Sequence, residues 1–148
     1  MPTYTVHARA GHLDHSVRAN LARAITRAHT AATGAPGFFA QVVFHDIDPE
    51  RHFVGGEPIA DDLVFVHGQI RAGRTPEQKE ALLGALNNAV QTVLGVPRRA
   101  VWVYLLELPP SDMVEYGYVL PAAGDEATWL ASLDAETQRH LRSLGDAS

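Results

Sequence analysis

The sequence predicts an α/β (α+β) domain in which two consecutive β-α-β units form one four-stranded sheet with both helices on one face. Strand and helix patterns alternate twice along the chain, and landmark residues recur 61 positions apart. A chain of 148 residues with 46% hydrophobic side chains can bury one core. We therefore expect a single domain over residues 1–148, with units at about 2–47 and 63–106 and a C-terminal extension at about 109–148.

The first unit begins with an alternating strand over 3–8. A helix follows from Asp14, its N-cap, to Gly34 and Pro36, which end it. Its apolar face comprises Val17, Leu21, Ala24, Ile25 and Ala28. The segment 39–47 is rich in Val and Phe and predicts a buried strand, and a loop containing glycine and proline follows.

The second unit repeats this order, with a strand over 63–70, a helix over 76–94 and a strand over 100–106. A capping box starts the helix, formed by Thr75, Pro76 and Gln78. Three pairs of landmarks lie 61 residues apart: Asp14 and Thr75, Gly34 and Gly95, Pro36 and Pro97. This common spacing indicates a duplication, and each unit should be a right-handed crossover between parallel strands.

The remainder of the chain predicts helical structure. Pro109 and Pro110 interrupt it, 111–116 is typical of a short capped helical turn, and 125–144 has helical character. The anchors of this tail are Trp129, Leu130, Leu133 and Leu141. Because both crossover helices cover one face of the sheet, its other face should be buried by oligomerisation.

Composition excludes several classes of protein. A formal net charge of −5 disfavours nucleic acid and anionic membranes as partners, and the lack of cysteine excludes thiolate chemistry and Cys-type metal sites. The sequence has no long apolar stretch and no signal-type start, so we expect a cytoplasmic protein. His7, His12 and His15 span a strand and a loop, a spacing that does not favour a metal site. Phosphate-binding and dinucleotide-binding motifs are absent.

Pro2 is a candidate catalytic residue. If Met1 is removed, Pro2 carries a free secondary amine, which can act as a general acid or base near neutral pH. Alternatively, Pro2 only starts an edge strand, where proline is tolerated.

Three further residues form a candidate anion site. Arg71 and Arg74 lie between a strand and the start of the second helix, where forked cations suit a small carboxylate or phosphate, although loop arginines are often only solvated. His29 continues the apolar stripe of the first helix and should lie near Pro2, because that helix returns to the edge where the chain begins. It could equally be a core histidine with satisfied hydrogen bonds.

Glu115 and Tyr104 are candidates for handling water or a substrate oxygen. Glu115 could act as a general base, and Tyr104, in the last strand, could donate a hydrogen bond. Considered separately, each residue could instead be structural or solvated.

Together these features resemble the tautomerase superfamily, whose small β-α-β proteins use an amino-terminal proline. More narrowly, the chain is similar to the cis-3-chloroacrylic acid dehalogenase family over nearly its whole length. The segments that carry the resemblance are Phe65-Val66-His67-Gly68, Arg71-x-Gly73-Arg74, Trp102-Val103-Tyr104 and Met113-Val114-Glu115-Tyr116-Gly117. The chain departs from the family at Tyr118, where the dehalogenase carries arginine, and along its tail.

The resemblance implies a tautomerase/MIF-like fold, a homotrimer without cofactor or metal, and a role for each candidate. Arg71, Arg74 and His29 would hold a small carboxylate substrate. Glu115 would direct water to C3 of the substrate, together with Tyr104, which could come from a neighbouring subunit. Pro2 would protonate C2 of the substrate. The implied enzyme is a hydratase or dehalogenase, and so a lyase or hydrolase, that forms malonate semialdehyde. A phenylpyruvate-type tautomerase, hence an isomerase, and a non-enzymatic binding module are the alternatives.

Overall fold

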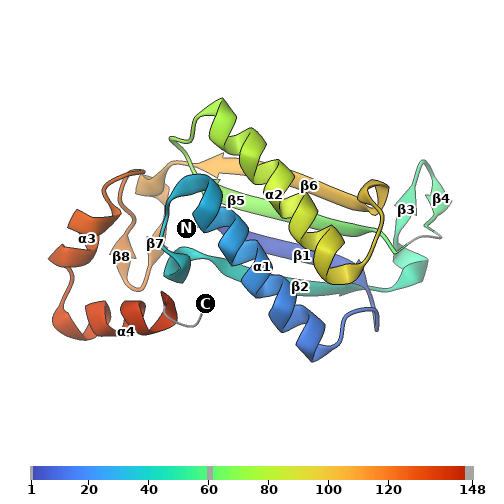
Figure 1. Ribbon diagram of the computed structural model, residues 1–148, viewed down its shortest axis with the longest axis horizontal. Coiled ribbons are helices and arrows are strands. Elements are labelled where there is room, and N and C mark those ends of the chain that lie inside the picture. The colour runs from blue at the N-terminus through green and yellow to red at the C-terminus, as the bar shows by residue number, and fades with distance from the viewer. Residues whose placement is uncertain (1, 60–61, 146–148) are drawn as a thin grey trace.

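The chain folds around a four-stranded sheet with the order β2-β1-β5-β6 (Figure 1). This computed structural model describes residues 2–59 and 62–145. The strands are β1 (Thr3–Arg9), β2 (Gln41–Ile47), β5 (Val64–Arg71) and β6 (Val101–Leu108). The pairs β1–β2 and β5–β6 are parallel, as predicted, and β1 and β5 join the two units antiparallel.

Two long helices lie side by side on one face of the sheet, which confirms the predicted layers (Figure 1). They are α1 (His15–Thr33) and α2 (Pro76–Leu94). Asp14 caps α1 by accepting a hydrogen bond from the Val17 amide at 2.8 Å, and the predicted capping box starts α2. Both helices end at a glycine in the left-handed conformation.

Alternation along the strands separates a buried face from an open one. The main core forms between the sheet and the two helices. Its buried side chains include Tyr4, Val6, Val64 and Val66 from the strands and Leu21, Ile25, Leu82, Leu86 and Val90 from the helices. Neither long helix covers the opposite face, where Trp102, Tyr104 and Leu106 of β6 are exposed. Because β6 is an edge strand, this apolar surface continues to the side of the sheet.

The repeat extends further than the sequence predicted. The start of α1 and that of α2 are 61 residues apart, and so are the first residues of two hairpins that follow the parallel strand pairs. The hairpins are β3 (Phe53–Val54) with β4 (Glu57–Pro58), and β7 (Val114–Glu115) with β8 (Tyr118–Val119). Short 3₁₀ turns recur at the same spacing: Gly37–Phe39, Pro49–Arg51, Arg98–Ala100 and Pro110–Asp112.

Two predicted elements were wrong in detail. The second strand begins at Gln41, not at residue 39, because Phe39 belongs to a 3₁₀ turn after Pro36 and is fully buried there. The helical turn predicted over 111–116 is a 3₁₀ turn followed by the β7–β8 hairpin. Tyr116 (φ 53°) and Gly117 (φ 86°) both have positive φ, which matches the two-residue turn that joins twisted strands.

The C-terminal extension forms two helices and a second small core. Helix α3 (Glu126–Ser132) ends at Leu133, where the backbone is extended, and α4 (Ala135–Gly145) follows. The buried side chains of this core are Phe38, Phe39, Leu120, Leu133 and Leu141, against which Trp129 and Leu130 pack. The extension therefore lies against the turn that follows α1, beyond one end of the sheet (Figure 1). None of the described helices is long and apolar enough to cross a membrane.

Gly68 is required by the position of Tyr4, its neighbour across β1 and β5. A Cβ at Gly68 would lie 2.7 Å from Tyr4 Cε1 and 2.9 Å from Leu105 Cδ2, and Tyr4 is fully buried. We expect Gly68→Ala to lower the free energy of unfolding by about 1–3 kcal/mol in urea titrations. Gly84→Ala, in an open position of α2, is the control and should raise it by roughly 0.5–1 kcal/mol. Equal effects of the two substitutions would contradict the steric argument.

Candidate active site

The candidate site forms where β1 begins, beside the end of β5. Pro2 is buried, and its carbonyl accepts a hydrogen bond from the Gln41 amide at 2.9 Å, which ties it to β2. Because Thr3 pairs with Gln69, Pro2 lies next to the last residues of β5, which ends at Arg71. The sheet register thus brings residues 2 and 71 to the same edge.

His29 lies in α1 directly above this edge and is held by Tyr4. Its side chain is only 3% exposed, and its Nδ1 lies 2.7 Å from Tyr4 Oη. Burial, reinforced by the positive charge of Arg74, lowers the pKa of His29 to about 3, so the ring is neutral near pH 7. Burial raises the pKa of Tyr4. A protonated Tyr4 hydroxyl can donate to Nδ1, and this leaves Nε2 of His29 as a donor for a ligand.

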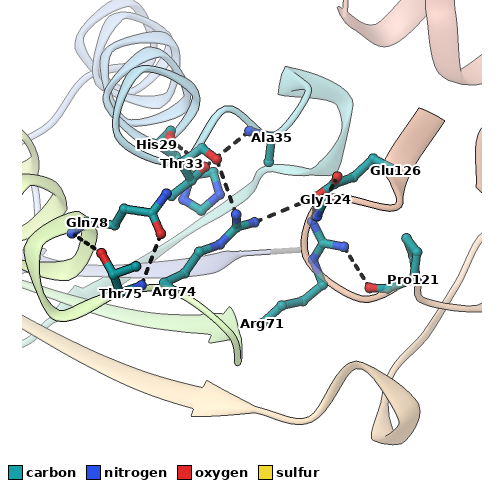
Figure 2. Close-up of polar contacts among 10 residues, drawn as sticks. All are labelled: His29, Thr33, Ala35, Arg71, Arg74, Thr75, Gln78, Pro121, Gly124 and Glu126. Atoms are coloured by element: carbon teal, nitrogen blue, oxygen red, sulfur yellow. Dashed lines mark hydrogen bonds and ion pairs between the residues drawn. The ribbon is translucent and has the colours of Figure 1, made fainter.

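Arg71 makes polar contacts with the C-terminal extension (Figure 2). The residue is 2% exposed. Its Nη1 donates to the Pro121 carbonyl at 2.8 Å, and its Nη2 donates to Glu126 Oε1 at 2.5 Å. Its guanidinium carbon lies 5.1 Å from the centroid of the Phe39 ring. Arg71 therefore connects the sheet, the turn after α1 and α3.

Arg74 lies beside Arg71 and shares its acidic partner. Its Nη1 donates to the Thr33 carbonyl at the negative end of the α1 dipole, at 3.2 Å, and its Nη2 lies 3.7 Å from Glu126 Oε1 (Figure 2). Burial and the neighbouring Arg71 lower the pKa of Arg74. Although burial opposes ionisation of Glu126, hydrogen bonds and Arg71 hold its pKa below the usual value. Two cations thus share one carboxylate.

Glu115 lies in β7 and brings a second carboxylate to the site. Its hairpin is fastened by Tyr116, whose hydroxyl donates to the Phe38 carbonyl at 2.8 Å. Burial raises the pKa of Glu115, an effect that the charge of Arg71 partly offsets. Its Oε2 is buried and has no hydrogen-bond partner among residues 2–59 and 62–145. A half-buried carboxylate with a raised pKa and a free oxygen is suited to accept a proton from water.

Tyr104 does not join this group within one chain. It is 56% exposed and lies on the open face of the sheet, in the middle of β6 and away from the end of β5 where Arg71 lies. The structure therefore brings together five of the six candidates, Pro2, His29, Arg71, Arg74 and Glu115, at one end of the sheet. In the described part of the chain, no group of three or more acidic or histidine side chains could hold a metal ion.

Sequence reasoning missed two residues of the site. The sequence pattern predicts Tyr4 only as part of a strand, although its place two residues after Pro2 puts it on the same face. The sequence pattern of the tail indicates only apolar anchors and does not distinguish Glu126. Nothing local in the sequence links residue 126 to residue 71.

Comparisons with known proteins agree with this architecture. A family model described as "Putative oxalocrotonate tautomerase enzyme" matches residues 1–133. The crystal structure of N1, a member of the cis-3-chloroacrylic acid dehalogenase (cis-CaaD) family, is 38% identical with a TM-score of 0.93, covering 95% of this chain and 99% of that one.

Two further structures are more distant. The symmetric trimer of the wild-type fused 4-OT named Q0 is 32% identical with a TM-score of 0.73, and covers 82% of this chain and 98% of its own. The macrophage migration inhibitory factor of Toxoplasma gondii is 18% identical with a TM-score of 0.67, covering 80% and 99%, and shares the fold. No curated protein matches the chain.

The lowered pKa of His29 makes stability depend on pH. In the unfolded chain the ring takes up a proton near its ordinary pKa of about 6.5, whereas the folded ring resists protonation to about pH 3. This contribution to stability is complete above pH 6.5 and is lost as the pH falls toward 3. We expect the difference in unfolding free energy between wild type and His29→Gln to shrink by about 1–2 kcal/mol from pH 7 to 5.5 in urea titrations. A constant difference would show that His29 titrates normally.

Proposed function

The chain belongs to the tautomerase superfamily, with a fold like that of the cis-3-chloroacrylic acid dehalogenase family, and from this premise we propose that it hydrates a small α,β-unsaturated carboxylate. Superfamily membership supports an enzyme. The finer proposal is that water adds to a 3-haloacrylate or to 2-propynoate, with Pro2 as the proton donor.

The observation that carries this proposal is the buried arginine pair, which holds a carboxylate group in this structure. Paired guanidinium groups bind carboxylates through forked, charge-assisted hydrogen bonds. Neutral His29 adds an uncharged donor beside them, so it can stabilise negative charge without adding a third cation next to the Pro2 amine. A substrate carboxylate bound here would place its carbon chain toward the start of β1.

Each chemical step then has a group to perform it. Glu115 removes a proton from water, and the oxygen bonds to C3. The C2–C3 π electrons shift toward the carboxylate, where the arginines and His29 stabilise the developing charge. The Pro2 ammonium then protonates C2. With a 3-chloro substrate, the resulting chlorohydrin loses chloride and a proton to give malonate semialdehyde, so the net change is one water gained and one HCl lost.

We further propose that Tyr104 completes the site of a neighbouring copy in a homotrimer. Its hydroxyl lies on the open sheet face together with exposed Trp102 and Leu106, an apolar surface of the kind that protein interfaces cover. The fused 4-OT relatives named as trimers support this assembly. Tyr104 would then orient the attacking water from outside the chain that supplies Glu115.

A tautomerase is the second candidate, because the matching family model describes oxalocrotonate tautomerases. In this reaction Pro2 acts as a neutral base and moves one proton between the oxygen and carbon of an enol such as phenylenolpyruvate. Glu115 has no step in it. The two candidates therefore differ in whether activity requires Glu115.

The first test follows malonate semialdehyde from cis-3-chloroacrylate and 2-propynoate. We expect wild type to convert at least one of them, and Glu115→Gln to lower kcat about 10²- to 10⁴-fold because water loses its base. Glu57→Gln, an exposed carboxylate in the repeated hairpin, is the matched control and should retain wild-type activity. Turnover of neither compound, together with enol–keto conversion lost in Pro2→Ala, would favour the tautomerase.

Intact mass spectrometry complements the activity assay. Catalysis by Pro2 requires that Met1 be removed, because a proline nitrogen within a peptide bond has no basicity. Material that retains Met1 should be inactive and should resist labelling of Pro2 by 3-bromopropiolate. Full activity with Met1 retained would exclude the proline mechanism.

Subunit mixing tests the location of Tyr104. Tyr104→Phe and Glu115→Gln should each lose activity alone. In co-expressed mixed trimers, a chain with intact Glu115 can receive Tyr104 from its neighbour, so roughly a quarter of the sites should recover by random assembly. Mixing two preparations of the same variant is the control and should recover nothing. Mixed trimers without recovered activity would show that Tyr104 does not act across the interface.

A further inference from the structure

The contact between Glu126 and the two arginines has a consequence for how a ligand reaches the site. We propose that Glu126 occupies the place of the substrate carboxylate in the free protein, so that helix α3 is displaced when a carboxylate binds. The inference rests on the proposed function, because it concerns the same arginine pair. It makes Glu126 the residue that sets the affinity and the charge preference of the site.

The hydrogen-bonding capacity of Arg71 carries the first step. One of its terminal nitrogens donates to the Pro121 carbonyl and the other to Glu126, and the residue is 2% exposed. Glu126 Oε1 also lies 3.7 Å from Arg74 Nη2, so one oxygen faces both cations. A ligand carboxylate cannot reach the Nη atoms of Arg71 while these partners remain.

The segment before α3 closes the site from outside. The Gly124 amide donates to Glu126 Oε2 at 2.9 Å, which fixes the carboxylate against its own turn (Figure 2). A Cβ built on Gly73, between the two arginines, would lie 3.5 Å from Ala123 Cβ. Residues 121–126 therefore lie directly on the loop that carries the arginines, and the Arg74 side chain is only 7% exposed beneath them.

Helix α3 is held weakly enough to move. It has seven residues, and none of them is buried. Apart from Glu126, its contacts include the hydrogen bond from Trp129 Nε1 to the Val119 carbonyl and partial packing of Trp129 and Leu130 on the second core. Segments with few buried apolar contacts open at low free-energy cost.

Charge balance favours exchange over addition. Two guanidinium groups share one carboxylate, and the exchange of Glu126 for a ligand carboxylate keeps that count. A neutral ligand would leave the two buried cations without the carboxylate that contacts them, which is strongly unfavourable. The site should therefore select small monocarboxylates and reject their amides, with Glu126 as the internal competitor.

Calorimetric titration with propionate, a saturated carboxylate that cannot be hydrated, tests the competition. We expect Glu126→Gln to bind propionate at least about tenfold more tightly than wild type, because the competing charge is gone. Asp125→Asn is the matched control: it makes the same change of charge at the adjacent exposed residue, which makes no side-chain cap contact, and its affinity should be that of wild type. Unchanged or weaker binding by Glu126→Gln would overturn the inference.

Thermal melts cover the case in which Glu126→Gln is unstable. The substitution leaves two buried cations partly unbalanced, so propionate should raise the Tm of Glu126→Gln by several degrees more than that of wild type. Equal shifts in the two proteins would count against Glu126 as a stand-in for the ligand.

Trp129 reports directly on α3. In a Trp102→Phe background it is the single tryptophan, and propionate should change its emission along the same saturation curve that calorimetry gives. Saturable binding without a change at Trp129 would overturn the displacement. The proposed function fails separately: if Arg74→Ala does not weaken propionate binding by Glu126→Gln, the arginine pair is not a carboxylate site.

Discussion

Burying two guanidinium groups side by side is the constraint around which this end of the molecule is organised. Two like charges out of water need acceptors on every side. The chain provides the Thr33 carbonyl at the end of α1, the Pro121 carbonyl, the Glu126 carboxylate and the Phe39 ring. These acceptors come from three separate parts of the sequence. Burial lowers the pKa of His29, and the charges of Arg74 and Arg71 lower it further, so the arginine pair adds to the preference for a neutral ring.

A second constraint on the molecule is that helices cover only one face of the sheet. Because α1 and α2 take one face, the other presents Trp102, Tyr104 and Leu106 to solvent in the single chain. Five candidate residues gather at one end of the sheet, and Tyr104 remains apart from them on the open face. Assembly and catalysis are therefore linked in the proposed function: the interface that covers the apolar face is also the route by which Tyr104 can complete a site.

Most of the fold could be predicted from local signals, and the parts that could not depend on distant contacts. Helix limits followed from Asp14, Thr75 and the glycine caps, which act within a few residues. The Val- and Phe-rich composition around Phe39 predicts a strand, whereas packing in the second core places Phe39 in a 3₁₀ turn. At the site, periodicity could place Pro2 and His29 at one edge. It could not reveal Glu126, since its ion pair crosses 55 residues of sequence.

The 61-residue repeat also explains why the two halves do not each carry a copy of the candidate site. The position equivalent to Pro2 in the second half is Leu63, whose nitrogen is an amide inside the chain. The second unit therefore cannot present a free amine at this position, whatever residues surround it. The counterparts of His29, Arg71 and Arg74 are now Val90, Ala10 and Leu13. The two halves therefore contribute different groups to one site: the first supplies Pro2 and His29, and the second supplies Arg71, Arg74 and Glu115.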